Sequence, residues 1–300
     1  MTPDAQALRS LEIPDLARFE PGPGGLTRLA ITSPLAEAHI CLHGAHVTHF
    51  QPSGAAPVLF VSARSFFENG KPIRGGVPVC FPWFSAHSEK PELPAHGFAR
   101  TMQWEVESLS VDGDQTVVTV LRLTSNDATR ALWPHDFVLR HHITVGRQLV
   151  MMLEVENVSA APFRFEEALH TYLAVGDVRE AAVTGLGNAT YLDKTDALKP
   201  RTEGPQPLRF TGETDRIFPG TRATCVLEDS RTARWITIEK GGSETTVIWN
   251  PWIAKAAAME DFGDDEWLRM ACIETANTAE NAITLAPTAK HSMRAAISVA

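Results

Sequence analysis

A short stretch from Phe163 to Val175, FRFEEALHTYLAV, places titratable side chains inside a run of strand-forming residues. Successive side chains of a strand point to opposite faces, so the large apolar residues of this stretch share one face. The other face carries Glu166, Ala168, His170 and Tyr172. A small, polar and titratable face suits either solvent or the floor of a binding site, where a histidine beside carboxylates can transfer protons.

A second candidate carboxylate is Glu274, which lies in the otherwise apolar stretch RMACIETAN. At strand spacing it shares a face with Leu268, Met270 and Cys272. A buried carboxylate is costly without a partner, and partial burial would raise its pKa towards the working range of a general base. Two interpretations remain open: a catalytic base and one half of a buried ion pair.

The stretch from Lys71 to Phe84, KPIRGGVPVCFPWF, contains more unusual residues than a structural turn needs. Arg74 precedes Gly75 and Gly76, whose backbone freedom would let a ligand approach the main chain. Trp83 and Phe84 offer flat apolar surface of the kind that packs against a sugar ring. The ordinary alternative is a rigid sheet edge with a buried aromatic cluster.

The next motif, LPAHGFAR, adds His96 and Arg100 beside another glycine. Guanidinium groups match phosphate oxygens in geometry and charge, so Arg74 and Arg100 could form a small anion pocket. The alternative is a pair of surface arginines with no shared role.

His43, His46 and His49 are spaced three residues apart, which at first suggests a zinc site. In a strand, however, residues three apart point to opposite faces, and no cysteine or carboxylate pattern completes a ligand set. We therefore expect no metal site.

The elements that must position these residues are short, strand-like segments separated by Gly, Pro, Asn, Asp or Ser. Only the segment SNDATRALWP indicates a helical turn, opened by Asn126 or Asp127 and stopped at Pro134. Because helices and strands do not alternate regularly, the sequence predicts an antiparallel β sandwich rather than a Rossmann fold or a parallel barrel. Residues 192–218 are expected to form a long ordered loop that carries function.

Composition excludes several classes of function. The 300 residues carry a formal net charge of -9, so no overall basic field attracts nucleic acid or an anionic membrane. The N-terminus lacks the features of a secretory signal, and no apolar run approaches the roughly 18 residues of a membrane span. We expect one domain over residues 1–300 and a cytoplasmic location, with four buried free thiols: Cys41, Cys80, Cys225 and Cys272.

Seven motifs, in order, resemble the hexose-6-phosphate mutarotases, the glucose-6-phosphate 1-epimerase branch of the aldose 1-epimerase superfamily. They are IRGGVPVCFPWF, LPAHGFAR, LWPHDF, FEEALHTYL, GETDRIF, VIWNPW and CIETAN. The resemblance covers about residues 25 to 290. It implies an all-β, antiparallel galactose-mutarotase-like supersandwich without a cofactor, which interconverts the α and β anomers of a small-molecule hexose 6-phosphate, glucose 6-phosphate above all. We expect a monomer.

By motif, the family's catalytic histidine falls on His170 and its catalytic glutamate on Glu274. Its sugar- and phosphate-contacting positions fall on Arg74, His96, Arg100 and Asp215. In the implied reaction Glu274 takes the proton of the anomeric hydroxyl while protonated His170 delivers one to the ring oxygen. Glu166 would either help to keep the imidazole charged or be a solvated surface charge.

One position departs from the family pattern, because Ala95 stands where some relatives have a substrate-contacting Gln. That departure puts the preferred sugar in doubt, whereas Arg74 with Arg100 favours a phosphorylated substrate. The alternatives are a free-sugar aldose 1-epimerase and a non-catalytic sugar-binding protein. A glycoside hydrolase is disfavoured because its usual mechanism needs two carboxylates that flank the bond.

Overall fold

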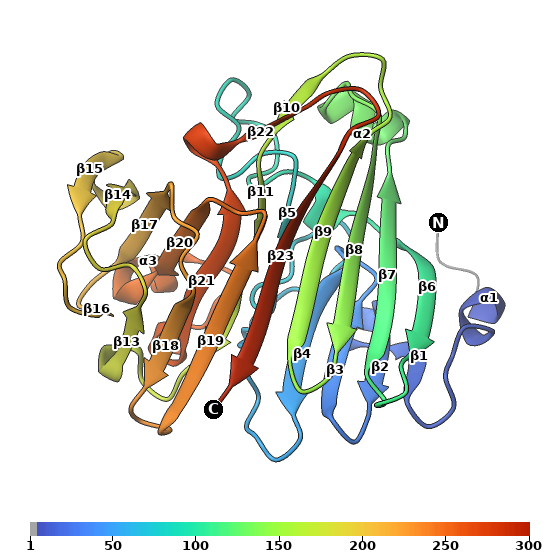
Figure 1. The fold of residues 1–300 in the computed structure, drawn as a ribbon, viewed down its shortest axis with the longest axis horizontal. Coiled ribbons are helices and arrows are strands. Elements are labelled where there is room, and N and C mark those ends of the chain that lie inside the picture. Colours follow the sequence, from blue (N-terminus) through green and yellow to red (C-terminus); the bar gives the residue numbers. More distant parts are fainter. Residues whose placement is uncertain (1–4) are drawn as a thin grey trace.

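The structure is a computed structural model that describes residues 5–300, so the first four residues of the polar N-terminal stretch lie outside the described part. It consists mostly of antiparallel sheets with few helices, as Figure 1 shows, and this confirms the predicted all-β class. Within residues 5–300, no helix has both the length and the apolar character needed to cross a membrane.

The largest sheet has nine strands, in the order β16-β13-β18-β19-β23-β9-β8-β7-β6, and runs across the width of the molecule in Figure 1. In β8 and β9 every second side chain is buried, the pattern of strands with one face on a core. The bounds are β6 (Glu105–Val111), β7 (Val117–Thr124), β8 (Phe137–Val145), β9 (Leu149–Asn157), β13 (Ala181–Thr184), β16 (Leu208–Arg209), β18 (Cys225–Asp229), β19 (Arg234–Gly241) and β23 (Lys290–Val299).

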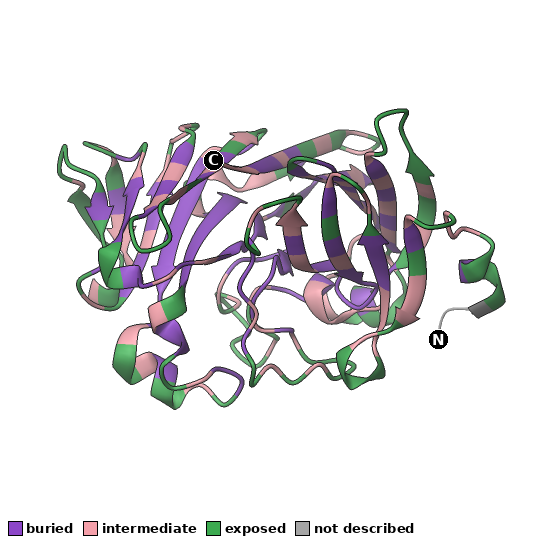
Figure 2. Ribbon diagram, turned by 90° about the horizontal axis from the view of Figure 1, so that it is seen from below, coloured by how far each residue is buried: buried purple, intermediate pink, exposed green. Residues whose placement is uncertain are grey.

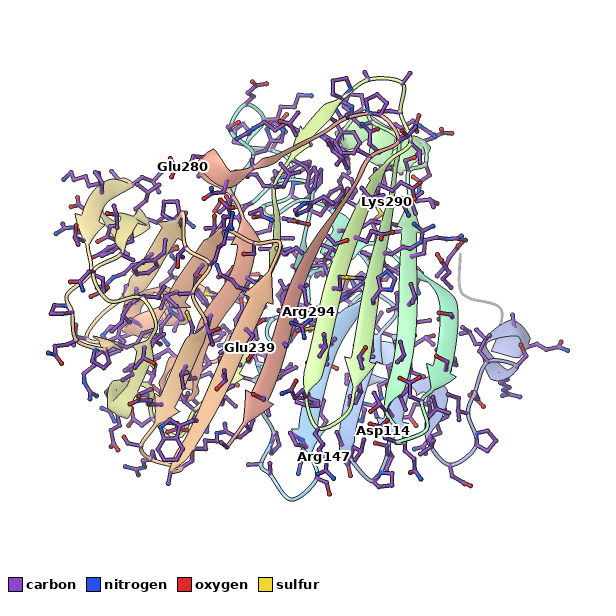
Figure 3. All side chains as sticks on the ribbon, viewed as in Figure 1. Asp114, Arg147, Glu239, Glu280, Lys290 and Arg294 are labelled. Carbon is purple, nitrogen blue, oxygen red and sulfur yellow. The ribbon has the colours of Figure 1, made fainter. Side chains whose placement is uncertain are left out.

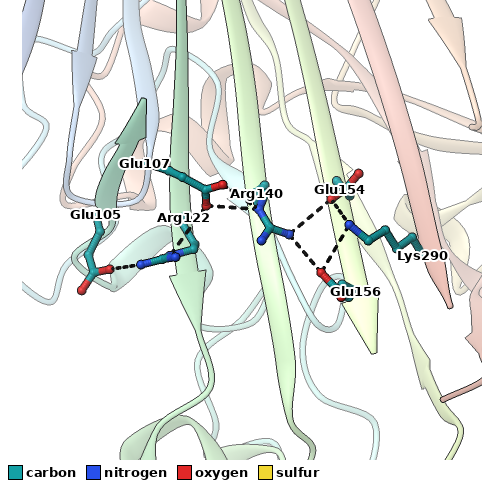
Figure 4. A network of polar contacts seen from close by, with 7 residues as sticks. All are labelled: Glu105, Glu107, Arg122, Arg140, Glu154, Glu156 and Lys290. Carbon is teal, nitrogen blue, oxygen red and sulfur yellow. Dashed lines mark hydrogen bonds and ion pairs between the residues drawn. The ribbon is translucent and has the colours of Figure 1, made fainter. Parts of the chain in front are cut away.

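The outward face of this sheet carries a ladder of alternating charges. The ladder runs from β6 to β23, and Figure 4 shows it passing from Glu105 through Arg122, Glu107 and Arg140 to the group of Glu154, Glu156 and Lys290. Figure 3 labels two further charged side chains of this sheet, Glu239 of β19 and Arg294 of β23. Cross-strand pairs of opposite charge suit a sheet face that stays in water.

The second sheet has eight strands, in the order β15-β14-β17-β20-β21-β11-β5, with β12 also pairing with β21. Its strands are β5 (Val79–Cys80), β11 (Glu167–Leu169), β12 (Tyr172–Ala174), β14 (Thr190–Asp193), β15 (Lys199–Thr202), β17 (Thr214–Pro219), β20 (Thr245–Asn250) and β21 (Met270–Asn277). Every residue of β20 and β21 is buried, so both faces of these central strands are covered, as the purple ribbons in Figure 2 illustrate.

Two smaller sheets complete the fold. The four-stranded one, β1-β2-β3-β4, lies behind the β6 to β9 half of the nine-stranded sheet in Figure 1, and one continuous core joins Phe50, Leu139 and Ile248 from three sheets. The bounds are β1 (Ala17–Pro21), β2 (Thr27–Thr32), β3 (Ala36–Cys41) and β4 (His46–Pro52), with β10 (Phe163–Phe165) pairing β22 (Ile283–Leu285).

The predicted helical turn is confirmed as α2 (Asp127–Leu132), capped by the Asn126 side chain, which accepts from the Thr129 N–H at 3.0 Å. The expectation that it is the only helical segment is wrong. The structure also has α1 (Ala5–Arg9), α3 (Trp252–Ala258) and single turns of 3-10 helix. The helix α3 has no side-chain cap, so the usual start signal is missing from its sequence. The single turns are η1 (Pro23–Gly25), η2 (Ala99–Thr101), η3 (Val178–Glu180), η4 (Lys194–Asp196), η5 (Glu266–Arg269) and η6 (Ala279–Asn281).

Two further expectations concern residues 192–218 and the cysteines. The expected long loop is wrong as a description, because this segment forms β15, β16 and most of β17, with β14 ending inside it. Its Pro and Gly residues lie in the turns between short strands and do not form one continuous loop. The four cysteines are buried and free, as predicted.

Candidate active site

The register of the eight-stranded sheet gathers several predicted residues on one face. Asp215 of β17 lies opposite Trp249 of β20, Trp249 opposite Cys272 of β21, and Cys272 opposite Tyr172 of β12. Side chains two positions apart in a strand share a face, so Glu274 stands beside Cys272. We call this face of the sheet the site face.

A small apolar cluster lies on the site face apart from the main core, whereas Tyr172, Trp249 and Cys272 of the same face pack into the main core. Its members are Cys80, Phe84, Ala168, Ile217, Val247 and Ala276, with Leu192 packed against them. Their neighbours along the strands, such as Leu169 and Ile273, belong to the main core. The two-faced interpretation of residues 163–175 is therefore confirmed for Ala168 and Leu169.

The stretch from Phe163 to Val175 is nevertheless not one continuous strand. It divides into β10, β11 and β12, and His170 lies in the break between β11 and β12. The backbone N–H of His170 donates to the Pro78 carbonyl at 3.0 Å, and the N–H of Thr171 turns back to the Leu169 carbonyl at 2.9 Å. The break holds the imidazole over the site face, next to the strand that carries Glu274.

His170 and Glu274 form a buried pair in which Nε2 of His170 lies 3.3 Å from Oε1 of Glu274. Burial lowers the pKa of His170 well below its usual range, and the charges of Arg100 and Arg74 add to this. Burial also raises the pKa of Glu274 well above its usual range, with the charge of Asp215 as a further cause. Nδ1 of His170 and Oε2 of Glu274 are buried and have no partner among the described residues.

Aromatic rings fix the orientation of the imidazole. The Tyr172 ring stacks on His170 with centroids 4.8 Å apart and an interplanar angle of 13°. The Trp249 and His96 rings approach His170 edge-on, with centroids 6.0 and 5.5 Å away. The side chain thus has little room to change rotamer.

Arg74 reaches the same group of rings but is already paired. Its Nε donates to Oδ2 of Asp261 at 3.1 Å, and one terminal nitrogen donates to the Tyr172 hydroxyl at 3.1 Å. Gly75 and Gly76 pack closely against the main chain of the protein itself. This corrects the interpretation that their backbone freedom lets a ligand approach. A Cβ on Gly75 or Gly76 would lie 2.4 or 2.3 Å from a backbone carbonyl oxygen of the protein itself, and both residues have positive φ.

Arg100 lies close enough for its charge to act on His170, and it keeps more free donors than Arg74. One terminal nitrogen donates to the Ala95 carbonyl at 2.7 Å, while its buried Nε has no partner among the described residues. Ala95 therefore supports the site through its main chain, although it lacks the side-chain contact of a Gln. His96 adopts a left-handed φ of 64°, and its Nδ1 lies 3.5 Å from the Cys80 sulfur.

Two predicted features do not belong to the site. Glu166 accepts from the Phe84 N–H, the Ala279 N–H and the Thr278 hydroxyl, so it is neither a partner of His170 nor a solvated charge. Trp83 donates to the Pro94 carbonyl and, with Phe84 and Trp133, lines a cavity of about 420 Å³ whose lining includes neither His170 nor Glu274.

The suspected zinc histidines do not converge. Nε2 of His43 and of His46 contact the main-chain carbonyls of Lys71 and Gly75, respectively. Among residues 5–300, one His/Cys/Glu group has ligand atoms that all lie within 4.8 Å of one another, namely His170, Cys272 and Glu274.

Sequence reasoning missed three contributors, Asp261, Trp249 and Lys194. Lys194 pairs with Asp215, its Nζ lying 3.1 Å from Oδ2. Asp215 is buried, and burial raises the pKa of its carboxyl, although the Lys194 charge acts in the opposite direction. Trp249 lies in the motif VIWNPW, but the motif alone assigns it no function. Asp261 and Lys194 lie in polar segments that contain no motif indicating a site.

The sequence and fold have close counterparts among known proteins. The family described as aldose 1-epimerase matches residues 27–298. A protein of Escherichia coli is 37% identical over 257 residues, covering 85% of this chain and 84% of the relative. A protein of Cenchrus ciliaris is 33% identical over 258 residues, covering 83% and 77%. Both relatives carry glucose-6-phosphate 1-epimerase as a provisional name.

Solved structures agree. The crystal structure of YeaD from Salmonella typhimurium, provisionally named a mutarotase, superposes with a TM-score of 0.89 at 31% identity, covering 98% of this chain and 97% of that chain. A galactose mutarotase-like protein from Clostridium acetobutylicum gives a TM-score of 0.74 at 15% identity, with 95% and 98% covered. The second likeness concerns the fold alone, and together they confirm the expected galactose-mutarotase-like architecture.

Proposed function

This chain belongs to the aldose 1-epimerase family of isomerases, and from that membership we propose that it interconverts the α and β anomers of a D-hexose 6-phosphate, glucose 6-phosphate being the first candidate. The observation that carries the proposal is the buried contact between His170 and Glu274, 3.3 Å apart, with one unpaired polar atom on each. Buried polar atoms without protein partners are expected where a substrate must supply them.

Mutarotation requires a base and an acid on one sugar ring. In the proposed reaction Glu274 accepts the proton of the anomeric hydroxyl as the bond between C1 and the ring oxygen breaks. His170 gives a proton to the ring oxygen, and C1 becomes an aldehyde. Rotation about the C1–C2 bond presents the other carbonyl face, and reversal of the two proton transfers closes the opposite anomer.

The pair holds one transferable proton in this scheme. Burial favours the uncharged forms of the two groups, a neutral imidazole and a carboxylic acid. The reactive form, imidazolium and carboxylate, differs only in the position of that proton between Nε2 and Oε1. An anion that neutralises Arg100 and Arg74 would raise the pKa of His170, because both arginines lower it now. A phosphate on the substrate would therefore favour the reactive form.

The arginines also support the choice of a phosphorylated substrate. Arg100 has an unpaired buried Nε, and Arg74 lies near enough for its charge to lower the pKa of Arg100. Two cations this close are more stable when they share a dianion. The 6-phosphate would lie at this end of the site, and His96 would contact the sugar between the arginines and His170.

The test is an anomerisation assay. Freshly dissolved α-glucose 6-phosphate is followed by polarimetry or NMR with and without enzyme, beside free glucose and galactose. We expect faster equilibration of the 6-phosphate than of either free sugar. Equal efficiency on free sugars would make the chain a free-sugar aldose 1-epimerase. Binding without any acceleration would make it a sugar-binding protein and would refute the proposal.

A further inference from the structure

Lys194 lies at the Asp215 end of the row of site residues, whereas Arg74 lies at the Tyr172 end. It begins η4 directly after β14, and its Nζ donates to the Ser85 hydroxyl at 3.0 Å and pairs with Oδ2 of Asp215 at 3.1 Å. The ammonium lies 5.7 Å from the centroid of the Phe84 ring. Lys194 therefore bridges the chain segment after β5, which carries Phe84 and Ser85, and the β17 edge of the site face.

The row of paired residues across the sheet separates the two ends. Asp215, Trp249, Cys272 and Tyr172 follow one another on four adjacent strands, with Lys194 at the Asp215 end. Adjacent strands are about 4.8 Å apart, so roughly 14 Å of backbone separates Asp215 from Tyr172. Arg74 bonds the Tyr172 end. A ligand over Glu274 would have cations on both sides.

The donors of Lys194 are not exhausted by the protein. An ammonium has three N–H groups, and two are used by Ser85 and Asp215. No third acceptor for Nζ lies within hydrogen-bond distance among residues 5–300. The side chain is 27% exposed, which leaves the third donor accessible to a ligand oxygen.

The charge of Lys194 also acts on the residues of the proposed reaction. The Lys194 charge adds to the lowering of the pKa of His170. At Glu274 and Asp215 it acts against burial, which raises the pKa of both carboxyl groups. Such effects require a position near the reacting groups. Lys255, the other cation near Asp215, is farther, with Nζ 3.9 Å from Oδ2, and its main partner is Glu213 at 2.9 Å.

We propose that Lys194 is a specificity-determining residue that donates a hydrogen bond to a ring hydroxyl of the sugar, next to a hydroxyl that donates to Asp215. This inference rests on the proposed function and deepens it. An adjacent donor and acceptor recognise a particular arrangement of neighbouring hydroxyls, and a site built this way rejects sugars that leave either group unpaired. Lys194 thus selects among epimeric hexose 6-phosphates, while the arginines hold the phosphate common to all of them.

The decisive experiment measures binding without turnover. 1,5-Anhydroglucitol 6-phosphate has no anomeric hydroxyl and cannot open, so calorimetry gives its affinity for the wild type, for Lys194→Met and for the control Lys255→Met. Loss of a hydrogen bond to a charged group is worth about 10- to 150-fold in affinity. We expect that loss in Lys194→Met alone, with the affinity for inorganic phosphate unchanged.

Deoxy analogues of the same ligand identify the contact. Removing the contacted hydroxyl should weaken binding to the wild type, yet Lys194→Met should bind this analogue as well as it binds the parent. For every other deoxy analogue, Lys194→Met should bind more weakly than the wild type by the same factor as for the parent ligand. An equal penalty for every analogue, a matching loss of phosphate affinity, or no loss at all would each overturn the inference.

The outcome is separable from that of the proposed function. If the wild type discriminates among the analogues through Lys194 but does not accelerate anomerisation, the proposed reaction fails and the hydroxyl contact stands. If the wild type accelerates anomerisation of glucose 6-phosphate and the analogue pattern is absent, only the role of Lys194 fails.

Discussion

Nε2 of His170 and Oε1 of Glu274 face each other across 3.3 Å, although strands β12 to β20 lie between the two residues along the chain. Both are buried, so neither exchanges protons freely with bulk water while a ligand covers the site. The two groups therefore act as one unit, and changing either should remove most of its effect.

The first prediction concerns this pair. His170→Ala and Glu274→Gln should each slow anomer equilibration by about 10²- to 10⁴-fold, the usual worth of a general acid or base. NMR of fresh α-glucose 6-phosphate measures the rate. Matched controls are His142→Ala in β8 and Glu239→Gln in β19, which belong to the nine-stranded sheet and not to the eight-stranded sheet that carries Glu274. Wild-type rates in both site variants would end the proposed mechanism.

The second prediction separates the two arginines. Arg100→Ala should raise KM for the 6-phosphate about 10- to 150-fold with little change in stability, since among residues 5–300 its side chain donates only to the Ala95 carbonyl. Arg74→Ala should raise KM similarly and also lower the free energy of unfolding by about 1–3 kcal/mol, because Asp261 is left without its partner. Urea denaturation beside Arg122→Ala, a surface-ladder variant, measures the second effect. Equal stabilities of the two site variants would contradict it.

The third prediction uses the ion pair between Nε2 of His291 and Oε1 of Glu167, 2.8 Å apart. Burial opposes charging of His291, but the hydrogen bond and charge of Glu167 outweigh it and raise the pKa of the imidazole. A raised pKa stabilises the fold fully below the unfolded value near 6.5, and the contribution disappears as pH rises through the folded value.

The difference in unfolding free energy between wild type and His291→Gln should therefore be largest in acid and shrink towards alkaline pH. Urea denaturation from pH 5 to 9 follows it. His142→Gln provides a control of opposite sign, because burial lowers the pKa of His142. A pH-independent difference at His291 would exclude a charged pair.

The fourth prediction concerns metals. Dialysis against a chelator should leave the anomerisation rate unchanged, because the acid–base pair supplies both proton transfers. Added Zn²⁺ should inhibit, since His170, Cys272 and Glu274 offer nitrogen, sulfur and oxygen ligands within 4.8 Å of one another. Cys272→Ser should weaken inhibition more than it changes the basal rate. Chelator-sensitive activity would refute this view.

The parts of the fold that could be predicted are those with strong local patterns. FVLRHHITV and TTVIWN coincide with β8 and β20 from end to end, because β-branched and aromatic residues are bounded there by turn residues. Strand β23 carries no such local pattern, because KHSMRAAISV is rich in small and polar residues. Its stability as a strand comes from pairing with both β9 and β19, which is tertiary information.

The candidate site divides in the same way. His170, Glu274, Arg74 and Arg100 belong to recognisable motifs, and the structure brings them together. Lys194 and Asp261 lie in segments without a recognisable sequence motif. Lys194 pairs with Asp215, more than 20 positions away, and Asp261 pairs with Arg74, more than 180 positions away. Such partners are known only once the chain has folded. The single domain over residues 1–300, the monomeric state and the cytoplasmic location stay predictions.

The complete burial of β20 and β21 has a consequence for hydrogen–deuterium exchange. Amides in central strands exchange only when a large part of the molecule opens, whereas edge strands open locally. Strand β15, at the edge of the same sheet, is exposed along its length, and β14 beside it leads directly into Lys194. We expect Glu274 to sit in the slowest-exchanging segment and Lys194 next to a fast one. Under mild denaturation the protein should then lose discrimination between sugars before it loses the ability to move their protons.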